Sequence, residues 1–184
     1  MKHLLLTTIA AVVLVGCGSS VDIHQAAKDG NIEAVKQHLD AGADVNAMNK
    51  YGWTPLFYAV QVDYKEVAEL LITKGADVNA KDVKGKTPLH YPSTKGIAEL
   101  LIAKGADLNA KDEWGCTPSH YYAASGHKGI TEILIANGAN VNAKDKDGDT
   151  PLDYYVESKA VAKIDDLLRK HGGKTGEELK AEGK

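Results

Sequence analysis

The hydrophobic positions of this chain fall into two regions with different patterns. Residues 4–15 form a continuous apolar run without a charge, whereas from about residue 21 onward the apolar residues recur at helical spacing. In KEVAELLITKG, residues 65–75, the side chains of Val67, Leu70 and Leu71 share one helix face, and Gly75 is suited to end that helix. The pattern therefore predicts a short apolar segment followed by small amphipathic helices.

Two markers repeat along the second region with one common and irregular period. Thr-Pro begins at residues 54, 87, 117 and 150, so its separations are 33, 30 and 33 residues, and Gly-Ala-Asp/Asn begins at 42, 75, 105 and 138 with the same separations. Threonine is a good N-cap, and proline is favoured at the first helical position because its missing N–H costs nothing there. Each unit therefore predicts an extended stretch with a glycine turn, a helix that starts at Thr-Pro, a second helix and a loop.

The stretch DVKGKTPLH, residues 82–90, resembles the D-x-x-G-x-T-P-L-H motif of ankyrin repeats. The resemblance covers about residues 21–173 and implies an all-α ankyrin-repeat solenoid, with a β-hairpin or turn plus a helix pair in each repeat. About five repeats are expected, at about 21–48, 49–81, 82–111, 112–144 and 145–173. The first lacks Thr-Pro and the fifth has a polar second helix, so both are expected to cap the solenoid. Residues 174–184 are expected to be a polar, frayed tail with room for one short helix.

The third repeat departs from this pattern because it is three residues shorter than its neighbours. Three residues are almost one helical turn, and Pro92 would interrupt what remains of the first helix. We expect a stunted first helix with a local notch or bend, which is either a ligand site or a neutral deletion absorbed by repacking. Five residues after the repeat threonine, Tyr122 and Tyr155 replace an expected alanine, which puts tight packing of the first helices there in question.

The N-terminal segment MKHLLLTTIAAVVLVG, residues 1–16, has a positive start at Lys2 and an apolar run too short to span a bilayer. It fits a secretory signal peptide. Leu14-Val15-Gly16-Cys17 resembles the lipobox of bacterial lipoproteins, which implies cleavage before Cys17, lipidation of that cysteine and a short tether over 17–20. Gly18 after the cysteine resembles lipoproteins of the outer membrane, so we expect a lipid-anchored protein of the bacterial cell envelope that faces the periplasm. The alternative is ordinary secretion with an incidental cysteine.

Charge and candidate chemistry narrow the function further. The net charge is −3 and the lysines alternate with acids, which argues against nucleic-acid binding. Gly85-Lys86-Thr87 lacks the first glycine of a phosphate-binding loop, and no residue spacing matches a metal site. The ankyrin resemblance implies that His90 and His120 bond back to the threonine of their own repeat. We therefore expect no cofactor, no metal and no catalysis, and we expect Cys116 at a solvent-facing loop tip.

The resemblance implies that partners bind through the loop tips and the groove side of the first helices. Four tyrosines occupy the position four residues after each repeat threonine, either as an aligned row of anchors or as seals between repeats. The expected function is a monomeric, membrane-anchored module that binds an unidentified protein; the alternatives are a small-ligand receptor or enzyme built on the notch, and a membrane-proximal spacer. The expected partner-binding residues are Tyr51, Trp53, Tyr58, Lys84, Lys86, Tyr91, Trp114, Tyr121 and Tyr154.

Overall fold

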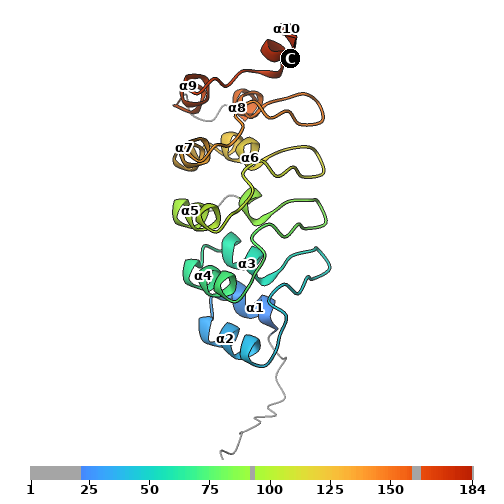
Figure 1. Cartoon of the computed structure of the whole chain (residues 1–184), viewed down its shortest axis with the longest axis vertical. Coiled ribbons are helices and arrows are strands. Elements are labelled where there is room, and N and C mark those ends of the chain that lie inside the picture. Colours follow the sequence, from blue (N-terminus) through green and yellow to red (C-terminus); the bar gives the residue numbers. More distant parts are fainter. Residues whose placement is uncertain (1–21, 92–93, 159–162, 184) are drawn as a thin grey trace, which may run out of the picture.

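The computed structural model describes residues 22–91, 94–158 and 163–183, and these residues form a stack of helix pairs (Figure 1). Cys17, the apolar segment before it, the tether and Pro92 lie outside the described residues. The described chain contains helices and loops but no strand. The inner helices are α1 (Ile23–Lys28), α3 (Pro55–Gln61), the 3₁₀ helix η1 (Pro88–His90), α6 (Pro118–Ala124) and α8 (Pro151–Ser158). The outer helices are α2 (Ile32–Asp40), α4 (Lys65–Thr73), α5 (Lys95–Ala103), α7 (Lys128–Ala136) and α9 (Lys163–Lys170).

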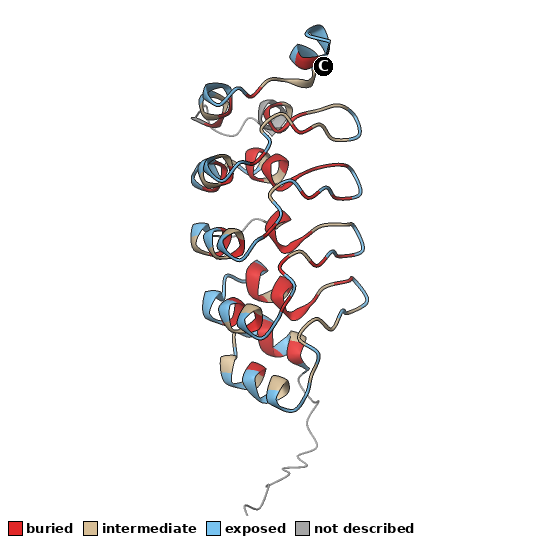
Figure 2. Ribbon diagram, viewed as in Figure 1, coloured by how far each residue is buried: buried red, intermediate tan, exposed pale blue. Residues whose placement is uncertain are grey.

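Five helix pairs stack in one direction, and long loops project from the inner helices on the side away from the outer helices (Figure 1). This arrangement confirms the all-α solenoid expected from the repeats. Buried residues concentrate on the inner helices and on the inward faces of the outer helices, while the far faces of the outer helices are exposed (Figure 2). Each outer helix from α2 to α7 buries at least one large apolar side chain completely. These side chains are Val35 in α2, Leu71 in α4, Ile97 and Leu101 in α5, and Leu134 in α7.

The loops of successive repeats are joined by hydrogen bonds that recur at the repeat period. An asparagine near the start of each loop accepts from a backbone N–H of the next repeat, as Asn46 does from Asp77 at 2.8 Å and Asn79 does from Asp107 at 2.8 Å. Further along each loop the tips bond to one another, since the Val83 N–H donates to the Tyr51 carbonyl at 3.1 Å. Because these bonds satisfy loop backbone and hold neighbouring loops together, the tips form a continuous ridge rather than separate arms.

The shortened third repeat has the stunted inner helix that its sequence predicts. Its inner helix η1 is three residues long, against seven residues in α3 and in α6. In those longer helices the carbonyls of Tyr58 and Tyr121 accept from N–H groups one turn further on. η1 ends before such a turn, and the Tyr91 carbonyl accepts instead from the Tyr122 hydroxyl of the next repeat, at 3.0 Å.

Tyr122 is completely buried in the main hydrophobic core, so the gap left by the deletion is filled from the following repeat. The expectation that a tyrosine at this position would disturb the packing is therefore wrong for Tyr122. Its ring is part of the core, and its hydroxyl replaces the missing N–H donor to the Tyr91 carbonyl. The side chain of Tyr155, at the same position of the fifth repeat, lies outside the described residues.

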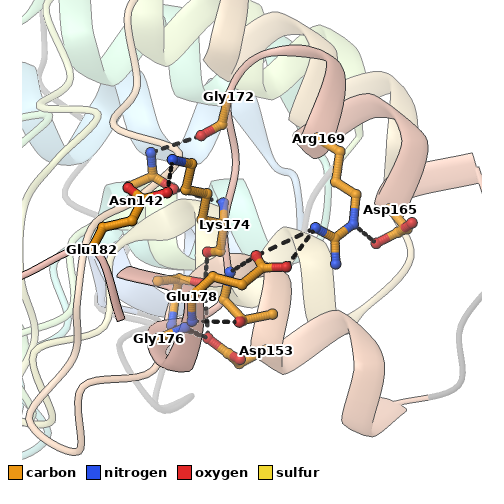
Figure 3. Close-up of polar contacts among 11 residues, drawn as sticks. Asn142, Asp153, Asp165, Arg169, Gly172, Lys174, Gly176, Glu178 and Glu182 are labelled. Atoms are coloured by element: carbon orange, nitrogen blue, oxygen red, sulfur yellow. Dashed lines mark hydrogen bonds and ion pairs between the residues drawn. The ribbon is translucent and has the colours of Figure 1, made fainter. Parts of the chain in front are cut away.

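The C-terminal segment contains the short helix for which the sequence left room, and over residues 175–181 it docks on the solenoid instead of fraying as expected. The short helix α10 (Gly176–Ala181) starts in a capping box of Thr175 and Glu178, and Leu179 is buried. Asn142 extends the loop bonding into this segment, because it donates to the Gly172 carbonyl and accepts from the Lys174 N–H (Figure 3). The segment docks because it supplies the same backbone groups that a further repeat would supply.

Side chains at this end also join α8, α9 and α10. Asp153 of α8 accepts from the Gly176 N–H at 2.7 Å, and Arg169 of α9 pairs with Asp165 and Glu178 (Figure 3). The fifth outer helix α9 buries Ile164 and Leu168 and exposes Asp166, Arg169 and Lys170, as expected for a cap.

Candidate binding surface on the loop tips

Each loop tip is folded by a carboxylate or amide that stands before its glycine turn. In the third repeat, Asp82 Oδ1 accepts from the N–H groups of Lys84 and Lys86, both at 2.9 Å. Asp112 and Asp145 repeat this arrangement in the next two tips. The tip conformation is thus held by local side-chain-to-backbone bonds, which leave the residues after the carboxylate on the outside of the turn.

The four aligned tyrosines connect each inner helix to its own tip. The hydroxyls of Tyr91, Tyr121 and Tyr154 donate to the second carboxylate oxygen of their tips, at 2.5, 2.6 and 2.8 Å, and the Tyr58 hydroxyl accepts from Asn49. Burial, together with the neighbouring carboxylates, raises the pKa of the first three hydroxyls above the usual tyrosine range. Each of these hydroxyls therefore bonds to the tip of its own repeat, and the four tyrosines are half-buried.

Two buried histidines hold consecutive repeats together. The Thr87 N–H donates to His90 Nδ1 at 3.0 Å, so the opposite ring nitrogen carries the hydrogen and donates to the Cys116 carbonyl at 3.2 Å. His120 makes the same pair of contacts with Thr117 and the Asp149 carbonyl. Burial lowers the pKa of both imidazoles, because desolvation disfavours their charged form. The structural role expected for these histidines is confirmed.

The second repeat has Phe57 where the third and fourth have histidine, and this exchange creates an aromatic cluster. The Trp53 ring stacks on Phe57 with centroids 5.7 Å apart, and it meets Tyr58 and Tyr91 edge-on at 5.1 and 5.2 Å. Phe57 itself is buried, and Thr54 Oγ1 is left without a hydrogen-bond partner among the described residues. The second repeat thus lacks the threonine–histidine hydrogen bond of the third and fourth repeats. In its place, Phe57 makes ring contacts with Trp53 and with Tyr91 of the third repeat.

A groove of about 420 Å³ opens over this cluster. Its walls are mainly aromatic and apolar, with Val83 and Tyr51 strongly exposed at the edge. The lining residues are Tyr51, Trp53, Tyr58, Asp82, Val83, Lys84, Lys86 and Tyr91.

Lys86 separates the groove from the next tip. Its Nζ lies 4.0 Å from the centroid of the Tyr121 ring and 5.3 Å from that of Trp114, and Lys84 lies over Trp114 as well, at 5.4 Å. Partial burial lowers the pKa of Lys86, whereas Asp112 and Asp82 act to raise it. The lysine ammonium groups therefore rest on aromatic faces by cation–π contacts and stay available at the rim.

Comparison with known proteins decides the family of this repeat architecture. The family described as ankyrin repeats (3 copies) matches residues 23–112 and again 93–177, which is most of the chain. The chain belongs to the ankyrin-repeat family. Its third ankyrin repeat is the one in which the inner helix is reduced to η1, and its fifth is followed by the docked helix α10.

Two proteins of mammals are similar to parts of this chain. The chain is 41% identical over 59 residues to cyclin-dependent kinase 4 inhibitor B of Rattus norvegicus. The aligned residues make up 32% of this chain and 45% of that protein. It is 39% identical over 51 residues to protein phosphatase 1 regulatory subunit 27 of Homo sapiens, which is 28% of this chain and 33% of that protein. The chain thus spans between a third and a half of the length of these two relatives.

The ankyrin fold brings most of the expected partner-binding residues to one place. Six of the nine line the groove, namely Tyr51, Trp53, Tyr58, Lys84, Lys86 and Tyr91. Trp114 and Tyr121 lie beyond Lys86, while Tyr154 lies further along the ridge. Their role in partner binding remains a prediction. Sequence reasoning missed that Phe57 packs against Trp53 beneath the groove, although Phe57 stands where the third and fourth repeats have histidine.

Cys116 is not at a solvent-facing tip, and that expectation is wrong. Only 2% of the residue is exposed, because the chain has already turned back toward Thr117 and packs against the next repeat. Its thiol lies 3.0 Å from the Tyr154 hydroxyl, whose own hydrogen is donated to Asp145, so the thiol is the donor in this contact. Burial raises the pKa of the thiol, which makes it a poor nucleophile.

The described residues offer neither a metal site nor a membrane-spanning helix. No group of three or more histidine, cysteine or acidic side chains in the described chain is placed to hold a metal ion. None of the helices in that part of the chain is long and apolar enough to cross a bilayer.

Proposed function

We propose that this chain is a lipid-anchored ankyrin-repeat module of the bacterial cell envelope that binds a protein partner through its loop tips and inner-helix surface. The observation that carries this proposal is the open aromatic groove with lysines at its rim, built from the tips of the second and third repeats. Tyrosine and tryptophan are frequent anchors of protein interfaces, and here they stand on a rigid scaffold. Of the two relatives named above, one is a kinase inhibitor by name and the other is a phosphatase regulatory subunit by name. These names support a binding role over catalysis.

A second candidate is a small-ligand receptor or an enzyme, and the volume of the groove favours it. A volume of about 420 Å³ lies within the range of small-molecule pockets, and Tyr58 and Tyr91 form two of its walls. However, Tyr122 is completely buried beside the shortened helix η1 and donates to the Tyr91 carbonyl, so this side chain belongs to the core and does not line the groove. The acidic lining residue, Asp82, already accepts hydrogen bonds on both oxygens, and the described lining contains no serine, threonine, cysteine or histidine. The groove therefore suits recognition better than catalysis.

Replacing both tip tryptophans is expected to remove the partner. Trp53 and Trp114 flank the two lysines on the ridge, and an anchor of this kind typically contributes about 2 kcal/mol or more. Cross-linking in the native envelope followed by mass spectrometry should therefore show a partner with the unchanged protein and lose it with Trp53→Ala/Trp114→Ala. Tyr64→Ala, an exposed aromatic at the start of α4, is the matched control and should leave the partner in place. An unchanged partner list in the double variant contradicts binding through the tips.

Cys17→Ser is expected to release the protein from the membrane fraction. The lipobox places the lipid on the Cys17 thiol, and serine cannot be modified in this way. The first repeat begins close to residue 21, and three extended residues reach about 10 Å, so the anchor would hold the first repeat against the membrane and leave the other tips free. The measurement is membrane fractionation with metabolic labelling by a palmitate analogue. A variant that stays in the membrane with unchanged processing excludes the lipid anchor.

A further inference from the structure

The lysines of this protein fall into two groups with different partners. On the outer helices, Lys65, Lys95 and Lys128 each pair with a glutamate four residues further along. At the second and third tips, none of the lysines forms an ion pair with another described residue. These tip lysines lie over aromatic rings instead, and they are Lys50 over Tyr51, Lys84 over Trp114, and Lys86 over Tyr91, Trp114 and Tyr121.

This difference leaves positive charge at the rim of the groove. A surface lysine that is paired at i, i+4 contributes little net field. The unpaired ammonium groups of Lys84 and Lys86 in the lining of the groove, with Lys50 over the ring of Tyr51, attract an anionic partner. Asp82 keeps its negative charge in the lining, but Lys84 and Lys86 outnumber it, and its oxygens are already engaged by two backbone N–H groups and by the Tyr91 hydroxyl. The free donors at the groove thus point to carboxylates on the molecule that binds there.

The charge changes sign along the same ridge. The fourth and fifth tips carry Glu113, Asp147 and Lys146, all exposed, and their net charge is negative. A flat anionic surface such as a membrane would meet this acidic end and the basic end at once, and it could not enter the apolar groove. A short acidic segment of a protein can be confined to the second and third tips, so the ridge favours a peptide over a membrane surface.

We propose that the groove between the second and third tips receives an aromatic or branched apolar side chain of the partner, and that Lys84 and Lys86 bind acidic residues on either side of that anchor. The inference rests on the proposed function and specifies the chemistry of the partner. Trp53, Val83 and Tyr91 provide the apolar contact, while the two lysines select the sign of the flanking charge.

The test is selection from a random dodecapeptide library displayed on phage, with the full chain as the target. The enriched sequences should share an aromatic or branched residue with aspartate or glutamate beside it. For a synthetic copy of an enriched peptide, Lys84→Glu/Lys86→Glu should weaken binding about tenfold or more, and added salt should also weaken it. Selection against that double variant should favour lysine and arginine in place of the acids. Lys65→Glu/Lys95→Glu makes the same change in net charge on the outer helices and should alter neither result.

Several outcomes would overturn this inference. Enriched peptides that are neutral or basic, no enrichment at all, or peptide binding that survives Trp53→Ala would each contradict it. Sedimentation with phosphatidylglycerol vesicles that depends on Lys84 and Lys86, without peptide enrichment, would assign the basic rim to a membrane surface instead. If Trp53→Ala/Trp114→Ala still removes a cross-linked partner while the library shows no acidic preference, the chemistry assigned here is wrong and the proposed function stands.

Discussion

Tyr122→Ala is expected to lower the free energy of unfolding by about 3–5 kcal/mol, the range for truncating a large buried aromatic side chain. Tyr122 is fully buried and fills the volume left by the shortened third repeat. Its loss leaves a cavity between η1 and α6 and removes the donor to the Tyr91 carbonyl. Because each repeat is stabilised by its neighbours, the third repeat should separate from the fourth. Urea denaturation followed by circular dichroism measures the effect.

Two further variants separate the contributions of volume and hydrogen bond at this position. Tyr122→Phe keeps the ring and removes only the hydroxyl, so it should cost about 1 kcal/mol. Tyr51→Ala removes an aromatic ring that is 55% exposed and should change stability by less than about 0.5 kcal/mol. If Tyr122→Ala unfolds at the same urea concentration as the unchanged protein, the following repeat does not compensate for the deletion.

Gly52→Ala is the second large effect that we expect, and it concerns the groove directly. Gly52 has φ +75°, and a Cβ there would lie 2.8 Å from the Val83 backbone nitrogen and 2.9 Å from the Asp82 Cα. Those backbone atoms cannot move away freely, because the Val83 N–H is bonded to the Tyr51 carbonyl. The left-handed conformation and the steric overlap together should cost roughly 2–5 kcal/mol and open the contact between the second and third tips.

Gly42 provides the matched control for this prediction. It has φ +88°, but a Cβ there would meet nothing within 4 Å, so Gly42→Ala carries the conformational cost alone, about 1–2 kcal/mol. Denaturation of both variants gives the difference, and hydrogen exchange of the Val83 amide reports on the tip contact. Equal destabilisation by the two substitutions, with Val83 still protected, would contradict a steric role for the close approach.

Much of the fold could be predicted because the repeat markers are local signals. Thr-Pro marks where the inner helices of the second to fifth repeats begin, and the glycine after each outer helix marks where it ends. Both signals could be read because they depend on backbone geometry within a few residues. The stunted helix of the third repeat followed from counting residues. The exposed position expected for Cys116 was wrong because its burial depends on Tyr154 of the next repeat, 38 residues away.

The candidate surface could be predicted as a set of residues but not as a groove. The alignment of repeats placed the tyrosines and tryptophans on the tips and inner helices, and the described structure has them there. The ring contacts of Trp53 with Phe57 and Tyr91 depend on the stacking of two repeats, which no single repeat contains. The unpaired state of the tip lysines likewise depends on which carboxylates the turns have already used.

By itself, the sequence determined the number and order of the repeats, the caps at both ends and the shortened inner helix, because caps, turns and helical periods are encoded within each repeat. Only the tertiary structure decided what fills the deletion, how the C-terminal segment docks and where an apolar groove meets unpaired lysines. Those features arise between repeats, where side chains about thirty residues apart compete for the same space and the same hydrogen-bond partners.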